Sequence, residues 1–183
     1  KCWDYRREPP RPALKIESVA RPSKFYKSKF VTCFRFIFYI TIENNSSRYN
    51  PAICLKTTDK PAAIQRPLRQ VTIVNCTLRS KSCAFKIGTE TWQDIEDIVV
   101  SNCTIYDSNR GIGLISRDGG RLRRMLFTSM TFECVAAPAC HWGEADPIFL
   151  SARRRNPQIE PGEITQIQFR GLCGECEGAI NMH

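Results

Sequence analysis

Residues 71–78 read Val-Thr-Ile-Val-Asn-Cys-Thr-Leu, and the pattern returns as Ile-Val-Val-Ser-Asn-Cys-Thr-Ile at 98–105 and as Met-Leu-Phe-Thr-Ser-Met-Thr-Phe at 125–132. The three stretches align without a gap, and each begins 27 residues after the previous one. Short apolar segments that return at a fixed period of roughly 20–50 residues are typical of solenoids, in which each repeat stacks on its neighbours. The sequence therefore predicts a stack of repeated coils.

A second apolar segment follows the first within each period. Polar turns join the two segments, and no helical pattern lies between them. Two short strands per period, connected by turns, are expected for an all-β protein folded as a parallel β-helix. The second segments are Ala52–Thr57, Ala84–Thr89, Gly111–Ser116, Pro147–Ala152 and Gly178–His183.

The alternation of apolar residues predicts which side chains face the core and where each coil bends. Val71 and Ile73 alternate with polar residues, as in a half-buried strand, but after Asn75 the inward set becomes Cys76 and Leu78. A change of parity at one residue indicates a bend. Asn accepts the left-handed backbone that such a bend often needs.

Stacking of the coils would place Asn75, Asn102 and Ser129 above one another as a hydrogen-bonded ladder. Both asparagines also lie in Asn-x-Thr sequences, which are acceptor sites for N-glycosylation. We favour the ladder, because an Asn at a strand end beneath another coil is expected to be poorly exposed.

The net charge of +9 is concentrated in the N-terminal part of the chain. Residues 1–48 contain 11 Lys or Arg against 4 Asp or Glu, which leaves 16 against 14 for residues 49–183. A basic segment of this kind suggests polyanion binding, with a solvated, irregular arm as the plainer alternative, which we favour. We expect no specific nucleic-acid partner.

Two stretches of this arm indicate that it is not part of the coil domain. Residues 1–13 resemble the translated product of an Alu-type interspersed repeat. The apolar stretch 30–42 is too short for a membrane span, which needs about 20 residues, and it lacks the features of a signal peptide. We interpret it as an added strand or as a non-native segment, with residues 49–183 forming a partial β-helix domain.

The ten cysteines are interpreted mainly as thiols. Met130 occupies the slot that Cys76 and Cys103 occupy in the other repeats, and a slot that accepts Met favours a soft apolar side chain. We therefore predict unbridged buried thiols for the strand cysteines, which are Cys54, Cys76, Cys83 and Cys103. A Cys76–Cys103 disulfide remains an alternative, because strands of adjacent coils lie about 4.8 Å apart.

A metal site is not predicted. Cys173-Gly-Glu-Cys176 is a lone Cys-x-x-Cys motif, and zinc would need two further ligands. Cys134, Cys140 and His141 are candidates, but their spacing matches no standard zinc pattern. We likewise predict no cofactor.

Three motifs in order, at coil spacing, resemble one protein family. Residues 84–91 (Ala-Phe-Lys-Ile-Gly-Thr-Glu-Thr), 109–120 (Asn-Arg-Gly-Ile-Gly-Leu-Ile-Ser-Arg-Asp-Gly-Gly) and 141–148 (His-Trp-Gly-Glu-Ala-Asp-Pro-Ile) are similar to the C-terminal half of glycoside hydrolase family 28. That family contains polygalacturonases and related pectinases. The resemblance, over about residues 49–183, implies a right-handed parallel β-helix, truncated here, and inverting hydrolysis of α-1,4-galacturonan or a related pectic polysaccharide. It also implies secretion.

The catalytic residues that the resemblance implies are not found. Inverting hydrolysis needs one carboxylic acid to protonate the leaving oxygen and another carboxylate to activate water. Asn50 and Pro51 occupy the positions of the family's paired Asp residues, and Cys83 occupies the position of its His. No Asn-Thr-Asp segment precedes them, and Gly113-Leu114-Ile115 replaces the substrate-binding Arg-Ile-Lys. We therefore expect this chain to be inactive as a hydrolase.

The remaining polar residues around the second segments form a candidate binding face. The planar guanidinium of Arg suits a uronate carboxylate, so Arg110 and Arg117 are predicted carboxylate contacts, with Lys86 supporting. Solvated rim charges or ion pairs to Glu90 and Asp118 are the alternative. The full predicted set is Lys56, Lys86, Glu90, Arg110, Arg117 and Asp118.

Three functional interpretations follow. The first is a polygalacturonase-like hydrolase, the second a non-catalytic β-helix remnant that binds uronate weakly, and the third a polyanion binder acting through residues 1–48. A stack of few coils exposes unpaired strand edges, so we expect a monomer that is prone to aggregate.

Overall fold

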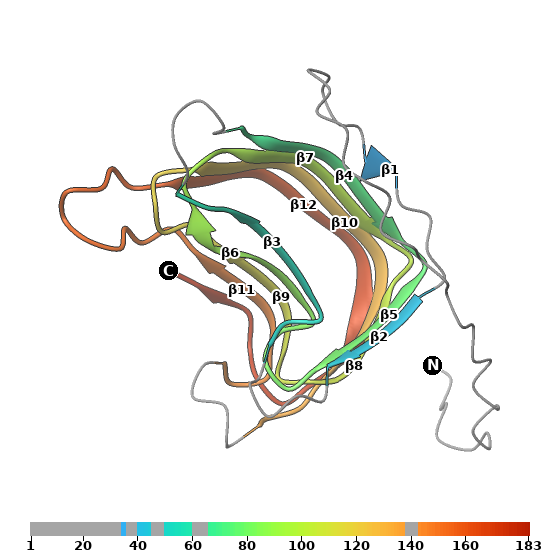
Figure 1. The fold of residues 1–183 in the computed structure, drawn as a ribbon. Helices are drawn as coiled ribbons and strands as arrows, with labels where there is room; N and C mark the ends of the chain where they lie inside the picture. Colours follow the sequence, from blue (N-terminus) through green and yellow to red (C-terminus); the bar gives the residue numbers. More distant parts are fainter. Residues whose placement is uncertain (1–33, 36–39, 45–49, 60–65, 138–142) are drawn as a thin grey trace, which may run out of the picture. The chain divides into compact units, whose positions relative to one another are not determined.

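Parallel β-strands form all the regular secondary structure in the described part of the chain. The computed structural model describes residues 34–35, 40–44, 50–59, 66–137 and 143–183, and these belong to one compact unit, Thr32–His183. They contain strands and no helix (Figure 1). The predicted all-β class and the parallel pairing are confirmed.

The first sheet is organised around two long strands. Strand β10 (Arg121–Cys134) pairs along its length with β12 (Glu163–Cys176). On its other side, β10 pairs with β7 in its first half and with β8 in its second half. The remaining strands continue these two rows, as β1-β4-β7 and β2-β5-β8. Their bounds are β1 Phe34–Arg35, β2 Ile40–Asn44, β4 Leu68–Val74, β5 Cys76–Ser80, β7 Ile95–Ser101 and β8 Thr104–Ser108.

The second sheet contains the second segment of each period, in the order β13-β11-β9-β6-β3. All its strand pairs are parallel. The bounds are β3 Ile53–Thr57, β6 Phe85–Thr91, β9 Arg110–Ile115, β11 Asp146–Ser151 and β13 Asn181–Met182. Figure 1 shows these strands lying side by side, inside the curve of the first sheet.

The strand register reproduces the repeat seen in the sequence. Val71 pairs with Ile98 and Ile98 with Met125. Residues that are 27 positions apart in the sequence therefore lie opposite each other on adjacent strands. Met125 pairs in turn with Ile167, which lies 42 residues further along. Strand β12 is thus a fourth copy of the first segment, displaced by the insertion between β11 and β12.

One predicted alignment in the second sheet is wrong by one residue. Aligning Gly178–His183 with Pro147–Ala152 places Phe149 over Ile180, whereas the structure pairs Phe149 with Asn181. Gly178 precedes β13 and packs closely against Glu144, where a Cβ atom would be 1.9 Å from the backbone oxygen. Gly178 therefore belongs to the turn and not to the strand.

The predicted bend residues adopt the left-handed backbone. Asn75, Asn102 and Ser129 have φ values of 57°, 53° and 54°, and Gly171 continues this column with 57°. The amide of Asn102 donates a hydrogen bond to Asn75 Oδ1 at 2.5 Å. The ladder is confirmed for this pair, although Asn102 is exposed and not covered as expected.

A second left-handed column lies five residues earlier and was not predicted. Gln70, Asp97, Arg124 and Gln166 have φ values between 55° and 59°. Each lies in the first half of its strand, at a position skipped by the register of the neighbouring strands. The first sheet therefore changes direction at two aligned positions. This holds for the consecutive strands β4–β5 and β7–β8 and for the long strands β10 and β12.

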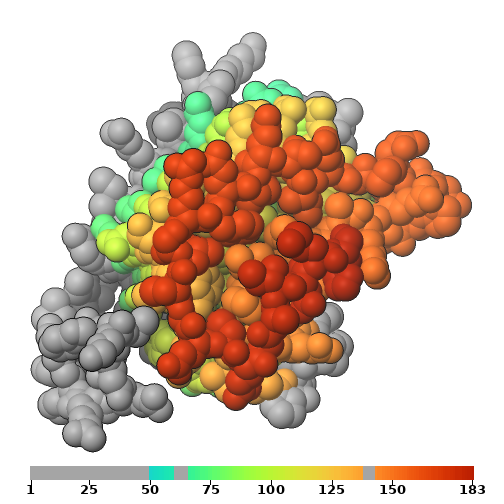
Figure 2. Space-filling view, turned by 180° about the vertical axis from the view of Figure 1, so that it is seen from behind, coloured from blue at the N-terminus to red at the C-terminus, as the bar shows by residue number. Residues whose placement is uncertain are grey.

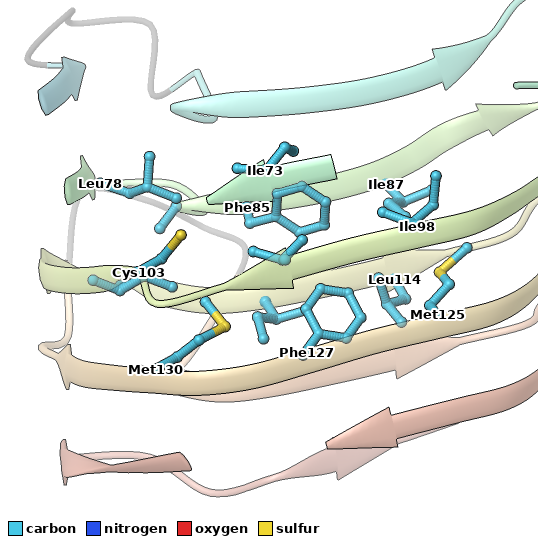
Figure 3. Close-up of a cluster of buried hydrophobic side chains, with 14 of the residues drawn as sticks. Ile73, Leu78, Phe85, Ile87, Ile98, Cys103, Leu114, Met125, Phe127 and Met130 are labelled. Carbon is cyan, nitrogen blue, oxygen red and sulfur yellow. The ribbon is translucent and has the colours of Figure 1, made fainter. Parts of the chain in front are cut away.

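The core lies between the two sheets, as the alternation predicted. Phe127 of β10 is fully buried, with ring centroids 5.6 Å from Phe85 of β6 and 5.2 Å from Phe169 of β12. Figure 3 shows buried side chains of this core, among them Phe85 and Phe127, stacked in rows from successive strands. The most deeply buried large residues are Leu78, Phe85, Ile87, Ile95, Ile98, Ile105, Ile112, Leu114, Leu122, Met125, Phe127 and Met130.

The strand cysteines are mostly buried thiols. Cys76, Cys83 and Cys103 are buried as predicted, whereas Cys54 is exposed, because its side chain points outward from β3. No disulfide joins any cysteine that the structure describes, so Cys76 and Cys103 are not bridged.

A buried carboxylate joins three strands of the first sheet. Glu96 of β7 is 1% exposed and forms ion pairs with Arg69, Arg123 and Arg124, the last two at 2.6 and 2.7 Å. Burial alone would raise the pKa of Glu96, but the hydrogen bonds from Arg123 and Arg124 lower it below its usual value. The cluster therefore ties β4, β7 and β10 together while Glu96 is ionised.

The left-handed column predicts how residue 102 responds to substitution. Asn102→Gly should retain the backbone, whereas Asn102→Val places a β-branched residue at φ 53°. We expect the Val variant to be about 1–2 kcal/mol less stable than the Gly variant in urea unfolding. Equal stabilities would contradict a backbone requirement at this bend.

The Glu96 cluster predicts a loss of stability in acid. A carboxyl whose pKa is lowered by folding stabilises the protein above its unfolded pKa of about 4.3, and this contribution is lost as the pH falls through the folded value. The urea midpoint of the unmodified protein should therefore fall between about pH 5 and pH 3. In Glu96→Gln that fall should be smaller. A parallel pH dependence in both proteins would show that Glu96 is not one of the groups responsible.

Candidate functional site

A cleft of about 580 Å³ opens on the outward face of the second sheet. Strands β6, β9, β11 and β13 contribute to it, together with the turns beside them. Inward residues of these strands fill the core, so alternating outward residues such as Lys86 and Phe149 reach the cleft, and Arg110 and Asp146 reach it from the first positions of β9 and β11. The lining residues are Ser82, Cys83, Lys86, Thr89, Arg110, Ile115, Arg117, Gly143, Glu144, Asp146, Phe149, Asn181 and His183.

A buried ion pair forms the centre of the cleft. Arg110, at the start of β9, donates from Nε to Asp146 Oδ2 at 2.9 Å, and its Nη2 lies 2.8 Å from the same oxygen. Arg110 and Asp146 are the facing residues of β9 and β11. The guanidinium carbon lies 3.9 Å from the centroid of the Phe149 ring, a cation–π contact. Strand pairing therefore holds the guanidinium between a carboxylate and an aromatic face.

Asp146 is fully occupied by partners from three segments. In addition to Arg110, Asn181 of β13 donates its side-chain amide to Oδ1, and the backbone N–H of Glu144 donates to Oδ2 at 3.2 Å. Asp146 is 1% exposed. A carboxylate satisfied in this way is a structural anion and is poorly placed to act as a general acid or to activate water.

Two other cations of the cleft have no such partner. Lys86 of β6 and Arg117, just after β9, form no ion pair with any residue the structure describes. The Nε atom of Arg117 is buried and has no hydrogen-bond partner within that described part. Both side chains are half-buried and line the cleft. They supply the positive charge that is available to an anionic group.

Cys83 stands at the position where the resemblance implies a His. Its thiol is buried and donates to Phe85 O at 3.0 Å. Burial raises the pKa of the Cys83 thiol to about 12, and the nearby Arg110 and Lys86 offset only part of that effect. The thiol therefore stays protonated at neutral pH and cannot take the place of a His as a general base.

Half of the predicted binding set lies in the cleft and half outside it. Lys86, Arg110 and Arg117 are brought together, as described above. Lys56 and Glu90 pair with each other at 3.7 Å and are not among the lining residues. Asp118 is buried, pairs with Arg155 at 2.6 Å and accepts a hydrogen bond from the backbone N–H of Thr91. Its role is to hold the turn after β9.

Two of the three replaced catalytic positions lie outside the cleft, whereas the third, Cys83, lines it. Asn50 and Pro51, where paired Asp residues were sought, are not among the lining residues. The backbone oxygen of Asn50 accepts a hydrogen bond from Ser80 Oγ at 2.7 Å. The acidic residues that line the described cleft are Glu144 and Asp146.

Sequence reasoning missed several residues of the site. Asp146, Phe149, Asn181 and His183 were not selected, although Asp146 lies inside a quoted motif. The usable signal was the alignment of the second segments, which places Asp146 one strand from Arg110. For Asn181 that signal was lost, because the predicted alignment was wrong by one residue.

The described residues contain no group of three His, Cys, Asp or Glu side chains arranged to hold a metal ion. Cys140 and His141, considered as zinc ligands, lie outside the described residues, as does most of the basic segment 1–48. No helix in the described part of the chain is long and apolar enough to cross a membrane.

Comparison of the chain with protein-family models, with curated proteins and with solved structures gave no match.

The buried pair at the cleft centre predicts strong energetic coupling. Arg110→Gln leaves the Asp146 carboxylate buried without its cation, which should cost about 3–5 kcal/mol in urea unfolding. The double variant Arg110→Gln/Asp146→Asn should be more stable than the sum of the two single effects, by about 1–3 kcal/mol. Additivity within about 0.5 kcal/mol would contradict the pair's role in holding β9 against β11.

Proposed function

We propose that this protein is a right-handed parallel β-helix whose outward cleft binds uronate-containing polysaccharide, such as pectic galacturonan, without hydrolysing it. In-register parallel strands and aligned bends support the β-helix part of the proposal. The motif resemblance to polygalacturonases supports the ligand class. For a protein with this ligand, we expect an extracellular location.

The observation that carries the binding proposal is the pair of cations without partners in one cleft. Lys86 of β6 and Arg117, just after the neighbouring strand β9, line the same space as Arg110. A uronate carboxylate has the charge and the planar oxygens that a guanidinium engages in two parallel hydrogen bonds. Arg110 is already neutralised by Asp146, so its part is to form the floor of the cleft with Phe149.

The absence of hydrolysis follows from the acids that the described cleft contains. Inverting enzymes use two carboxyl groups about 6.5–9.5 Å apart, one of them protonated. Here Asp146 is held by Arg110, Asn181 and a backbone N–H, and only Glu144 is exposed to solvent. A single exposed carboxylate does not provide both an acid and a base.

Calorimetric titration with trigalacturonate tests this function. Lys86→Gln and Arg117→Gln should each weaken binding by about tenfold or more, because each removes a charge-assisted hydrogen bond. Lys56→Gln is the matched control, since Lys56 pairs with Glu90 outside the cleft, and it should change affinity less than about twofold. Fully methyl-esterified trigalacturonate should bind more weakly than the acid.

Reducing-end release from polygalacturonate, measured on the same preparations, separates binding from hydrolysis. We expect binding with no release. Release by the unmodified protein would overturn the non-hydrolytic part and return the protein to the pectinase class. Failure of trigalacturonate to bind, or equal losses in Lys56→Gln and Lys86→Gln, would overturn the assignment of the cleft.

A further inference from the structure

Two cysteines face each other at the ends of the long strands of the first sheet. Cys134 is the last residue of β10, Cys176 is the last residue of β12, and the two are register partners. The backbone N–H of Glu177 donates to Cys134 O at 3.0 Å, so the pairing extends past the end of β12. Facing residues of parallel strands have Cα atoms about 4.8 Å apart, within the range of about 4.4–6.8 Å found for disulfides.

The two thiols differ in their access to solvent. Cys134 is 1% exposed, whereas Cys176 is half-buried against the core and followed by a turn. Burial raises the pKa of the Cys134 thiol, and the neighbouring Cys176 thiol, which is hydrogen-bonded to it, raises it further. Small reagents therefore reach Cys176 first.

We propose that Cys134 and Cys176 are a redox modification site, which a low-molecular-weight disulfide of the glutathione type converts reversibly into a disulfide bond. The Cys176 thiolate attacks one sulfur of oxidised glutathione and releases one glutathione thiolate. The Cys134 thiol, which faces Cys176, then loses its proton as it attacks Cys176 Sγ of the mixed disulfide, and the second glutathione thiolate is released. The protein loses two thiol protons, which the two glutathione thiolates take up, and two glutathione thiols are formed for each bond.

This bond would fix the segment that completes the cleft. Residues 177–183 run from the end of β12 to β13, where Asn181 donates to Asp146 and the His183 ring lies 5.5 Å from that of Phe149. Figure 2 shows residues from β11 onward, in orange and red, forming the surface of this face of the molecule. Ile180 and Met182 are 56% and 70% exposed there, so packing holds the segment weakly. The proposal does not depend on which ligand the cleft binds.

A second stacked pair provides an internal comparison. Cys76 and Cys103 immediately precede the register partners Thr77 and Thr104 on β5 and β8. Both are less than 4% exposed, and each thiol donates to a backbone oxygen two residues earlier in its own chain segment. This pair has similar spacing but no accessible entry thiol, and we expect it to stay reduced.

The test is a disulfide map after equilibration with oxidised glutathione. The full chain carrying Cys140→Ser and Cys173→Ser leaves one cysteine in each of the tryptic peptides 125–153 and 171–183. After alkylation of remaining thiols, these two peptides should be linked, while Cys76 and Cys103 should both be alkylated once the protein is unfolded. Adding Cys134→Ser or Cys176→Ser should abolish the link.

A second readout measures the consequence of the bond on unmodified protein. Trypsin cleavage after the exposed Arg170 under native conditions should be about tenfold slower in the oxidised than in the reduced protein. If the serine variants fail to fold, fragment ions of the linked peptides from the unmodified chain assign the bond to Cys173 or Cys176. Absence of a linked peptide, a bond through Cys173, or oxidation of the Cys76–Cys103 pair first would overturn the proposal.

Discussion

The structure depends on the in-register stacking of parallel strands from successive periods. Each strand of the first sheet exchanges backbone hydrogen bonds with the strand one period away, and the same register places like side chains in rows, such as Val71, Ile98 and Met125. A row of apolar residues at about 4.8 Å spacing leaves few voids, so each strand is stabilised by its neighbours and little by itself. The buried Glu96 cluster and the Asn75–Asn102 hydrogen bond follow the same rows on the outside of the sheet.

The cleft is a consequence of the same register. Because facing residues of neighbouring strands lie side by side, Arg110 and Asp146 meet without any special loop. The ion pair is therefore as fixed as the strands that carry it. Lys86, one strand away, shares the outward face and has no anion beside it among the described residues. The difference between a neutralised and an available cation is thus set by which residue the neighbouring strand places opposite it.

The sequence alone predicted the features in which the same kind of side chain returns in every period. The apolar alternation predicted the core, and the Asn residues marked one of the two bends. The other bend was invisible, because Gln70, Asp97 and Arg124 have no common preference for a left-handed backbone. Strand β12 was missed since the insertion before it breaks the period. Asp118 and Glu90 were chosen as charged residues that flank the second segments, and their pairing with Arg155 and Lys56 was not predicted.

A crystal structure of the protein soaked with trigalacturonate tests uronate binding in the cleft most directly. We expect an intact trisaccharide in the cleft, with one carboxylate within hydrogen-bond distance of Arg117 and Lys86 and a sugar ring near Phe149. A trisaccharide bound elsewhere, or a cleaved product in the cleft, would contradict it.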